Sequence, residues 1–334
     1  MATMTPRERI RATLTGEPVD RPPISLWRHF PGEDETARAL AGATVRFQRR
    51  YNVDLVKLMP TGMYPAIDYG VTVKASNDDI GTTRFAAGPI HAPGDWARLP
   101  AVSPAGGTLA REVEVTRLVR TALGPDAVVV QTIFGPLTIA AKIAGTAEAV
   151  TRSAEWDETA LRAGLDRISD DVIAFGRACL EAGADGFFFA TQLADRSALP
   201  DGMYRRLAMN YDLRVLNALR DGAWCTIVHL HGSAPMFELA DEYPVDAVNW
   251  HDRETRPSLA EALRLTARVI VAGISRRGVI VNGTPEDAAG EVRDAVRQTG
   301  GARLIVAPGC VIPYRAPEEN LQAARDAVMI TGQS

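Results

Sequence analysis

Cys225-Thr226-Ile227-Val228-His229-Leu230-His231-Gly232 is an apolar run that ends in two histidines and a glycine. Comparable runs recur on both sides of it, such as Val-Val-Val at 128–130 and Phe-Phe-Phe at 187–189. They lack polar alternation, so they are typical of parallel strands that are buried on both faces. The sequence predicts eight such strands, at residues 24–29, 54–59, 128–134, 186–191, 226–231, 247–250, 269–274 and 304–307.

Segments with helical spacing lie between most of these strands. The first helix is expected to begin at Thr5, with Pro6 at its first position and Glu8 completing a capping box, and to end at Gly16. The other predicted helices cover residues 36–51, 111–123, 138–144, 158–182, 201–219, 235–242, 257–268, 285–299 and 317–327. Eight strands that alternate with helices predict an α/β protein, a TIM (β/α)8 barrel with a single domain over residues 1–334.

One long excursion, residues 61–127, separates the second and third predicted strands. Within it, residues 71–73 and 82–85 are expected to pair as a hairpin around Asn77-Asp78-Asp79. Residues 92–107 are rich in proline and glycine and are expected to form a loop before the helix at 111–123.

A doubly wound open sheet is the main alternative to the barrel. That fold favours a glycine-rich turn after its first strand. The corresponding segment here, His29-Phe30-Pro31-Gly32-Glu33-Asp34, has no G-x-G-x-x-G pattern. The chain also contains neither a Walker A sequence nor a G-x-S-x-G elbow, so the barrel is the favoured fold.

Composition narrows the class of protein. Of 334 residues, 46% are hydrophobic and 23% charged, and the net charge of -4 gives no electrostatic reason to expect nucleic acid or an anionic membrane as partner. Three cysteines make no disulfide framework and fit a reducing compartment. No segment reaches the roughly 18 apolar residues of a membrane span, and the charged N-terminus does not resemble a signal peptide. We therefore expect a soluble, cytoplasmic protein that acts on a small molecule.

Soft metal ligands gather at the predicted strand ends. His229 and His231 are two residues apart, so both side chains project from the same face of one strand. Cys310 follows the eighth predicted strand. Active sites of TIM barrels lie at the C-terminal ends of the strands, where these three residues would meet. Because zinc accepts mixed nitrogen and sulfur ligands, they form a candidate zinc site; each alone is more often a hydrogen-bonding or core residue.

Other polar residues at strand ends are candidates for substrate contacts. Arg28 follows the first predicted strand and is the best anchor for an anion, because its guanidinium matches carboxylates; alternatively it is a salt-bridged loop residue. Gln192 and His251 are expected to orient the substrate, or else to be solvated loop residues. Lys57 lies inside the second predicted strand, where it either points into the barrel and needs a partner or faces the helix layer.

Short motifs from about Thr5 to Ala327 carry a resemblance to a known family. They are Arg7-Glu8-Arg9, Pro18-Val19-Asp20-Arg21-Pro22-Pro23, Gly135-Pro136-Leu137-Thr138, Gly183-Ala184-Asp185-Gly186, His229-Leu230-His231-Gly232, Asn282-Gly283-Thr284-Pro285-Glu286, Ala307-Pro308-Gly309-Cys310-Val311-Ile312-Pro313 and Pro317-Glu318-Glu319-Asn320-Leu321. In these motifs the chain resembles the uroporphyrinogen decarboxylase superfamily, whose fold is a TIM barrel.

The superfamily contains true decarboxylases and zinc-dependent methyltransferases. Arg28 matches the first arginine of the decarboxylase motif M-R-Q-A-G-R-Y, but Phe30-Pro31-Gly32 replaces the second, and Met59-Pro60-Thr61 replaces the catalytic F-S-D. The methyltransferases move methyl groups between corrinoid proteins and thiols and hold zinc with an H-x-C pair and a later cysteine. His229 and Cys310 match the outer two of these ligands, and His231 stands where the middle cysteine would be.

The resemblance implies a zinc-dependent methyltransferase or demethylase that works with a corrinoid protein and forms a dimer. A metal-independent decarboxylase of uroporphyrinogen or a related carboxylate, acting in tetrapyrrole biosynthesis, stays open. So does a non-catalytic protein that binds a corrinoid or tetrapyrrole. A metal hydrolase of the amidohydrolase kind ranks lower, because its H-x-H pair lies on strand one, whereas the pair here lies on strand five.

Overall fold

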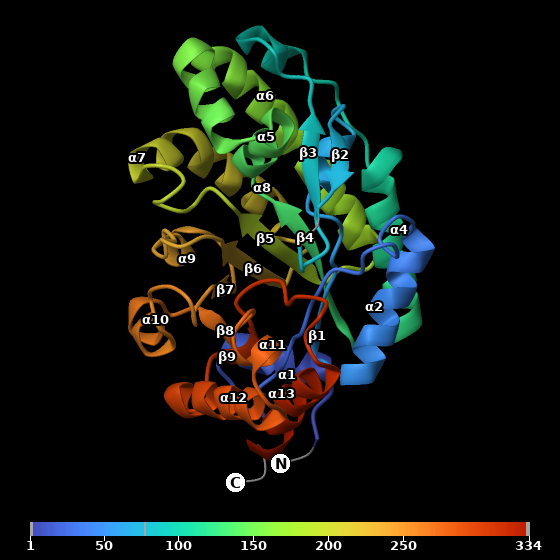
Figure 1. The fold of residues 1–334 in the computed structure, drawn as a ribbon, viewed down its shortest axis with the longest axis vertical. Helices are drawn as coiled ribbons and strands as arrows, with labels where there is room; N and C mark the ends of the chain where they lie inside the picture. The colour runs from blue at the N-terminus through green and yellow to red at the C-terminus, as the bar shows by residue number, and fades with distance from the viewer. Residues whose placement is uncertain (1–2, 77, 332–334) are drawn as a thin grey trace.

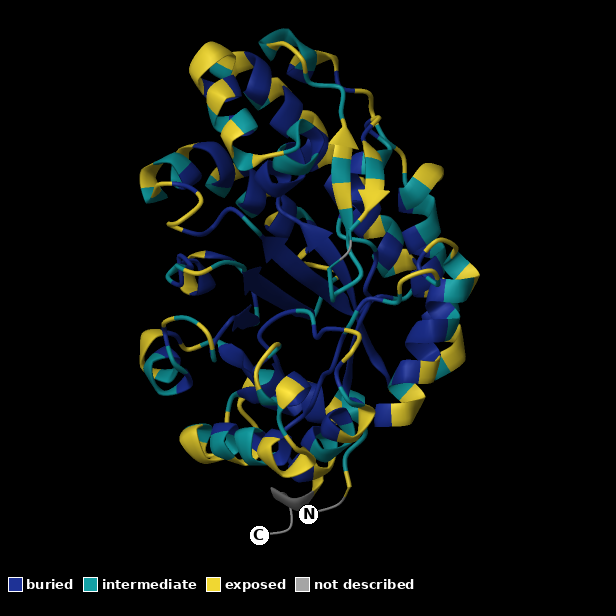
Figure 2. Cartoon of the chain, viewed as in Figure 1, coloured by how far each residue is buried: buried dark blue, intermediate teal, exposed yellow. Residues whose placement is uncertain are grey.

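A parallel sheet rolled into a barrel forms the centre of the protein (Figure 1). The structure, a computed structural model, describes residues 3–76 and 78–331. Among these residues the barrel has seven strands, in the order β1 (Leu55–Lys57), β4 (Val128–Phe134), β5 (Gly186–Thr191), β6 (Cys225–Leu230), β7 (Ala247–Trp250), β8 (Val269–Ile274) and β9 (Leu304–Pro308). Every residue of these strands is buried (Figure 2), which agrees with their unbroken apolar sequences. The predicted TIM-type barrel is confirmed.

The prediction of a full strand over residues 24–29 is wrong, although this segment closes the barrel. Only Ile24 forms a parallel bridge, to Val306 of β9. On the other side, the carbonyl oxygen of Ile24 accepts a hydrogen bond of 2.8 Å from the backbone N–H of Asp54. A longer ladder has little to pair with, because β1 has three residues and β9 ends at Pro308, which has no N–H.

Helices surround the barrel (Figure 1). Those that continue for at least two turns are α1 (Pro6–Thr15), α2 (Ala37–Tyr51), α4 (Gly107–Leu123), α5 (Pro136–Ala144), α6 (Ala147–Glu181), α8 (Asn210–Leu219), α12 (Pro285–Thr299) and α13 (Glu318–Thr331). The shorter ones are α3 (Tyr64–Ile67), the 3-10 helix η1 (Pro93–Arg98), α7 (Asp201–Tyr204), the π-helical turn η2 (Arg205–Met209), α9 (Leu239–Glu242), α10 (Leu259–Leu265) and α11 (Val279–Asn282).

Capping patterns in the sequence locate helix starts well. Thr5 and Glu8 form the predicted capping box of α1, and Gly16 ends this helix in the left-handed conformation. The predicted helix at 158–182 is the second part of α6, which begins eleven residues earlier. At Asp157 the backbone leaves helical geometry, and its carboxylate caps the N–H of Ala160. The chain therefore restarts a helix at the predicted position, inside a longer element.

Three other helix predictions and one loop prediction need correction. A π-helical turn, η2, interrupts the predicted helix at 201–219. The predicted helices at 235–242 and 257–268 shorten to α9 and α10. The predicted loop at 92–107 contains η1, in which Asp95 accepts hydrogen bonds from the N–H groups of His91 and Ala92. Asp95 thus caps the start of η1, and the capping box of Ser258 and Glu261 sets the start of α10 at Leu259.

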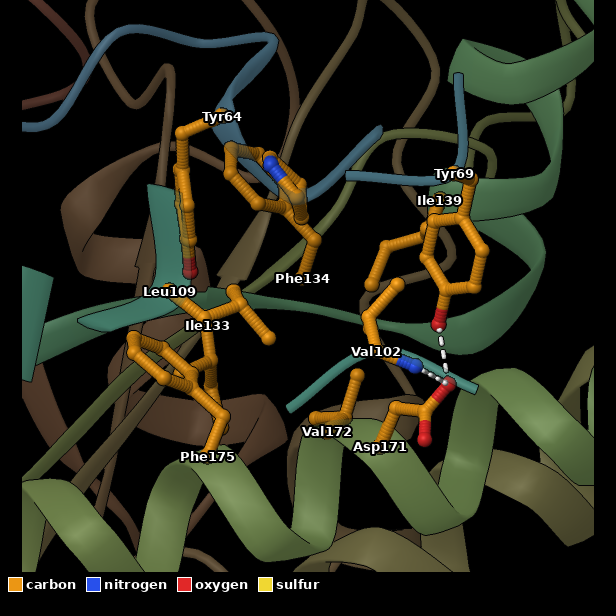
Figure 3. A pocket seen from close by; sticks show the side chains of 11 residues that line it. Tyr64, Tyr69, Val102, Leu109, Ile133, Phe134, Ile139, Asp171, Val172 and Phe175 are labelled. Carbon is orange, nitrogen blue, oxygen red and sulfur yellow. Dashed lines mark hydrogen bonds between the residues drawn. The ribbon is translucent and has the colours of Figure 1, made fainter. Parts of the chain in front are cut away.

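The excursion at 61–127 contains the predicted hairpin and packs on the barrel. Strands β2 (Thr72–Ala75) and β3 (Thr83–Ala87) pair antiparallel; Asn77 of the predicted turn lies outside the described residues. The Tyr69 hydroxyl donates a 2.8 Å hydrogen bond to Asp171 on α6, and the N–H of Val102 donates to the same oxygen (Figure 3). These bonds lie beside an apolar void of about 10 Å³, the space of one water molecule.

A buried ion-pair cluster holds the segment around Ile24 beside β1, where the barrel closes. Asp54, which is 1% exposed, accepts hydrogen bonds of 2.6 Å from both Arg9 and Arg21 and one of 2.9 Å from the N–H of Ile24. Arg9 also pairs with Asp20. The carboxylate of Asp54 thereby joins α1, Ile24 and β1.

Within the described part of the chain, no helix is long and apolar enough to cross a membrane.

Candidate metal centre

Three histidines and one cysteine converge at the C-terminal rim of the barrel. His229 is in β6, His231 and His251 follow β6 and β7, and Cys310 follows β9. Their ligand atoms all lie within 4.8 Å of one another. The Sγ atom of Cys310 is 3.8 Å from Nε2 of His229 and 3.8 Å from Nδ1 of His231. Ligands bound to one tetrahedral zinc ion are about 3.3 to 3.7 Å apart, so small adjustments would complete a site.

Strand register brings the histidines together. β6 and β7 pair in parallel with His229 opposite Asn249, so residues that follow the two strands leave the barrel at the same rim. Cys310 arrives there because Gly309 passes very close to β7. A Cβ atom at position 309 would lie 2.7 Å from the carbonyl oxygen of Trp250. Glycine is therefore required beside Cys310 to let β9 approach so closely.

Asp195 fixes the loop that follows His231. Its carboxylate accepts hydrogen bonds from the N–H groups of Ser233 and Ala234, at 3.0 and 2.9 Å. The intervening Gly232 has φ +115°, and a side chain there would collide with Asp195. These contacts hold the backbone next to His231 in one conformation, which limits where its imidazole can lie.

Asn249 determines which nitrogen of His229 faces the cluster. The Asn249 amide group donates to the carbonyl oxygens of Val271 and Pro308, at 2.6 and 3.1 Å. Its Oδ1 atom therefore faces Nδ1 of His229, 2.6 Å away, and accepts a hydrogen bond from the Nδ1–H group. Nε2 is then unprotonated and directed toward Cys310, as a metal ligand should be. Asn249 was not predicted as a site residue, although an asparagine within the apolar run 247–250 is a visible signal.

The electrostatics of the cluster favour a thiolate at Cys310 beside a neutral imidazole at His229. Burial lowers the pKa of His229 to about 4, so its ring is neutral near pH 7. Burial raises the pKa of Cys310, but its interactions with the surrounding histidines outweigh burial and hold this pKa well below its usual value. Nε2 of His251 is buried and has no hydrogen-bond partner within the described residues. A buried nitrogen without a partner is costly unless something else binds it.

A small cavity of about 140 Å³ adjoins the cluster. Its apolar wall is formed by Trp27, Met59, Pro60, Ile80, Phe134, Phe188, Ala190 and Val311. Polar groups enter it from His29, Lys57, Thr82, Thr132, Gln192 and Arg276, beside His229, His231 and Cys310. This is the composition of a small-molecule site, with an apolar lining and a few converging polar groups.

The structure distributes the predicted substrate residues over three places. Gln192 lines the cavity, as expected for a residue that orients a substrate. His251 lies within the metal-ligand cluster itself. Arg28 lies in a neighbouring open hollow, where it donates to the carbonyl oxygen of Tyr314 and lies over the ring of Phe47. The cations that do line the cavity are Lys57 and Arg276.

A parallel barrel that carries such a cluster and cavity where its strands end is the architecture of the TIM-barrel enzymes. A family comparison refines this class, because the model of the uroporphyrinogen decarboxylase (URO-D) family matches residues 5–329. The chain belongs to the URO-D family.

Several relatives of the chain are methyltransferases. It is 23% identical to the methylcobamide:CoM methyltransferase MtbA of Methanosarcina acetivorans, over 96% of this chain and 97% of that protein. It is 24% identical to MtaA of Methanosarcina barkeri, with the same activity in its name, over 98% and 99%. Among solved structures, a methyltransferase from Methanosarcina mazei has a TM-score of 0.84 at 19% identity, with 98% and 99% covered. A B12-independent methionine synthase from a Shewanella species has a TM-score of 0.55 at 14% identity, with 95% and 94% covered.

Proposed function

We propose that this protein is a zinc-dependent methyltransferase that moves a methyl group between a corrinoid, carried by a partner protein, and a thiol. The observation that carries the proposal is the convergence of imidazole and thiol ligand atoms within 4.8 Å of one another, beside a cavity with an apolar wall. The names of the curated relatives, methylcobamide:CoM methyltransferases, support the methyl donor and the thiol acceptor.

His229, His231 and Cys310 would hold the zinc ion, and His251 faces the fourth position. Zinc bound there would take up a thiol as its thiolate and lower its pKa, which creates the nucleophile for a methyl group. The net charge of the three ligands favours a thiol as the methyl acceptor, because two neutral imidazoles and one thiolate would leave one positive charge on Zn²⁺. A second thiolate cancels this charge.

The protein residues around the ion position and enclose the reactants. Asn249 holds the His229 ring with Nε2 toward the ion. His251, whose ring centre lies 4.8 Å from that of His231, would border the bound thiol, and Gln192 would orient the substrate from the cavity wall. Arg28 lies in the adjacent hollow of about 670 Å³, where it would attract an anionic group of the larger corrinoid reactant.

A reaction with free reactants tests the proposal. The zinc-loaded full chain is incubated with methylcobalamin and coenzyme M, and the methylated thiol is measured by mass spectrometry together with the corrinoid spectrum. We expect product with the zinc form and none after chelation. Equal turnover by zinc-loaded and chelated protein, or release of carbon dioxide from uroporphyrinogen without any methyl transfer, would refute the proposal in favour of the decarboxylase alternative.

Replacing Asn249 tests the orientation of His229. Asn249→Ala removes the acceptor of the Nδ1–H proton, so the His229 ring loses both its fixed tautomer and its fixed orientation. We expect zinc affinity to fall by about 10- to 100-fold, which is typical for loss of a group that orients a metal ligand. Competition with a chromophoric chelator measures the affinity.

Thr191→Val is the matched control for this variant. The Thr191 hydroxyl donates to the backbone carbonyl of His229, at 3.1 Å, and does not touch its ring. We expect Thr191→Val to keep its zinc affinity. If both variants lost zinc equally, the effect of Asn249→Ala would reflect a general loosening of β6 and not the histidine tautomer.

Homodimerisation and a corrinoid-protein partner remain predictions from the family resemblance. Light scattering of the purified chain tests the first, and co-purification with a methylated corrinoid protein from the same organism tests the second. A monomer that transfers methyl groups from free methylcobalamin alone would contradict both.

A further inference from the structure

His29 stands between two spaces at the open end of the barrel. One is the cavity of about 140 Å³ beside the metal-ligand cluster, and the other is the open hollow of about 670 Å³ that contains Arg28. Among the described residues that line these two spaces, His29 alone is common to both. Its side chain is buried, with 5% exposed. The imidazole therefore forms part of the wall between the hollow and the metal centre.

The hairpin side of this wall is held in place. The tip of the hairpin contributes Ile80 and Thr82 to the cavity lining, and Asp78 and Gly81 to the lining of the hollow. The carboxylate of Asp78 accepts hydrogen bonds from the N–H groups of Ile80 and Thr82, at 3.2 and 3.0 Å. Gly81 lies so close to Pro31 that a Cβ atom at this position would collide with the proline ring. Hydrogen bonds and close packing thus fix this part of the wall.

No comparable contact holds the ring of His29. Its Nδ1 atom is buried and has no hydrogen-bond partner among the residues that the structure describes, whereas Nδ1 of His229 is bound to Asn249 at 2.6 Å. The backbone before it is held as far as Trp27, whose carbonyl oxygen accepts a 3.3 Å hydrogen bond from the N–H of Ile312. A buried polar atom without a partner costs free energy, so the ring gains a hydrogen bond when it turns out of the wall.

The ring is also neutral, so it can move without carrying a charge through an apolar wall. Burial, helped by the ammonium group of Lys57, lowers the pKa of His29 to about 4. Cys310 on the cavity side and Asp78 on the hollow side act in the opposite direction and do not outweigh burial. Near pH 7 the imidazole therefore carries no charge in either position.

We propose that the side chain of His29 is a gate between the hollow and the metal centre. In the closed position, which the structure shows, the imidazole fills the wall. In the open position it turns into the hollow, where a polar group of an occupant supplies the hydrogen bond that the wall lacks. An occupant shifts the gate only through this difference in contacts between the two positions.

The identity of the occupant rests on the proposed function. A methyl donor in the hollow would open the way to a thiol at the metal centre, and an empty hollow would leave the metal centre closed. His29 is then a positioning residue, which controls when the two reactants meet and takes no part in bond making.

The reactivity of Cys310 tests the gate without any metal or methyl donor. The metal-free full chain is treated with N-ethylmaleimide, and peptide mass spectrometry follows the rate of modification at Cys310. His29→Ala removes the gate, and because the ring is neutral its loss leaves the charge around Cys310 unchanged. We expect the variant to react at least about 10-fold faster than the wild type, since a minor open position has a population of about 10% or less.

His29→Phe and His91→Ala are the matched controls. Phenylalanine fills the wall with a ring but has no nitrogen that gains a partner by turning outward, so Cys310 should react no faster than in the wild type. His91 is an exposed histidine outside both linings, and His91→Ala should keep the wild-type rate. The buried Cys179 and Cys225 should stay unmodified in every variant, which checks that the fold has not loosened.

The rates at Cys310 decide the proposal. Equal rates in His29→Ala and the wild type overturn the gate, and so does a His29→Phe variant that reacts as fast as His29→Ala. If Cys179 and Cys225 become reactive in His29→Ala, the comparison of His29→Phe with the wild type decides instead: a rate at or below that of the wild type supports the gate, and a higher rate overturns it.

Methyl transfer tests the link between the gate and the methyl donor. Zinc-loaded His29→Phe should transfer the methyl group of methylcobalamin more slowly than the wild type, with an unchanged zinc content. An unchanged rate of transfer would overturn this link. Absence of transfer in the wild type refutes the proposed function and leaves the gate, which the reactivity of Cys310 tests by itself, in place.

Discussion

Replacing Cys310 with alanine should empty the metal centre and abolish methyl transfer. Cys310 contributes the thiolate of the cluster, and its Sγ atom lies 3.8 Å from ligand atoms of both His229 and His231. Because it supplies the ligand itself, its loss should cost more than the about 10- to 100-fold in affinity that surrounding groups contribute. We expect Cys310→Ala to lose its zinc during purification, and elemental analysis of the protein measures this directly.

Cys225→Ala provides the control for this variant. Cys225 is also a buried cysteine and begins β6, the strand that carries His229, but it lies at the other end of the strand. The pKa of its thiol is raised well above the usual value by burial, as expected for a core residue. It should keep one zinc ion per chain. Full zinc occupancy and activity in Cys310→Ala would contradict the assignment of the ligands.

Replacing Asp54 with alanine should strongly lower the stability of the fold. Asp54→Ala leaves the buried guanidinium groups of Arg9 and Arg21 without their shared carboxylate and removes the acceptor for the N–H of Ile24. Removing one partner of a buried ion pair typically costs about 3 to 5 kcal/mol. We expect the free energy of unfolding to fall by this amount, as measured by urea denaturation.

An exposed ion pair serves as the comparison for Asp54. Asp170 pairs with Arg214 on the surface, where it is more than half exposed. Asp170→Ala should change the free energy of unfolding by no more than about 1 kcal/mol. If Asp54→Ala changed the free energy of unfolding equally little, the contact between Ile24 and β1 would not depend on the buried ion pairs.

The sequence predicts the barrel and the convergence of the histidine and cysteine side chains well, for a physical reason. Unbroken apolar runs identify buried parallel strands, and every such strand ends at the same rim of a barrel. Residues that directly follow the runs, such as His231, His251 and Cys310, therefore lie near one another even though the intervening loops are unknown. The exception is the segment 24–29, whose apolar sequence resembles a strand but which has too little neighbouring strand to pair with.

Features that depend on strand register and close approach were not accessible from the sequence. The function of Asn249 follows from its position opposite His229 in the neighbouring strand. The requirement for a glycine at position 309 follows from the carbonyl oxygen of Trp250, because a Cβ atom there would lie only 2.7 Å from it. The sequence also could not place Arg28, which lies in a hollow that does not share the lining of the cavity; its role as an anion anchor stays a prediction.

X-ray absorption at the zinc edge tests the metal centre most directly. The zinc-loaded full chain is measured before and after addition of a thiol. We predict one sulfur ligand at about 2.3 Å with nitrogen ligands at about 2.0 to 2.1 Å, and a second sulfur once the thiol is present. A zinc ion without any sulfur ligand, or a sulfur count that the thiol leaves unchanged, would contradict a centre in which Cys310 holds the ion and the substrate completes it.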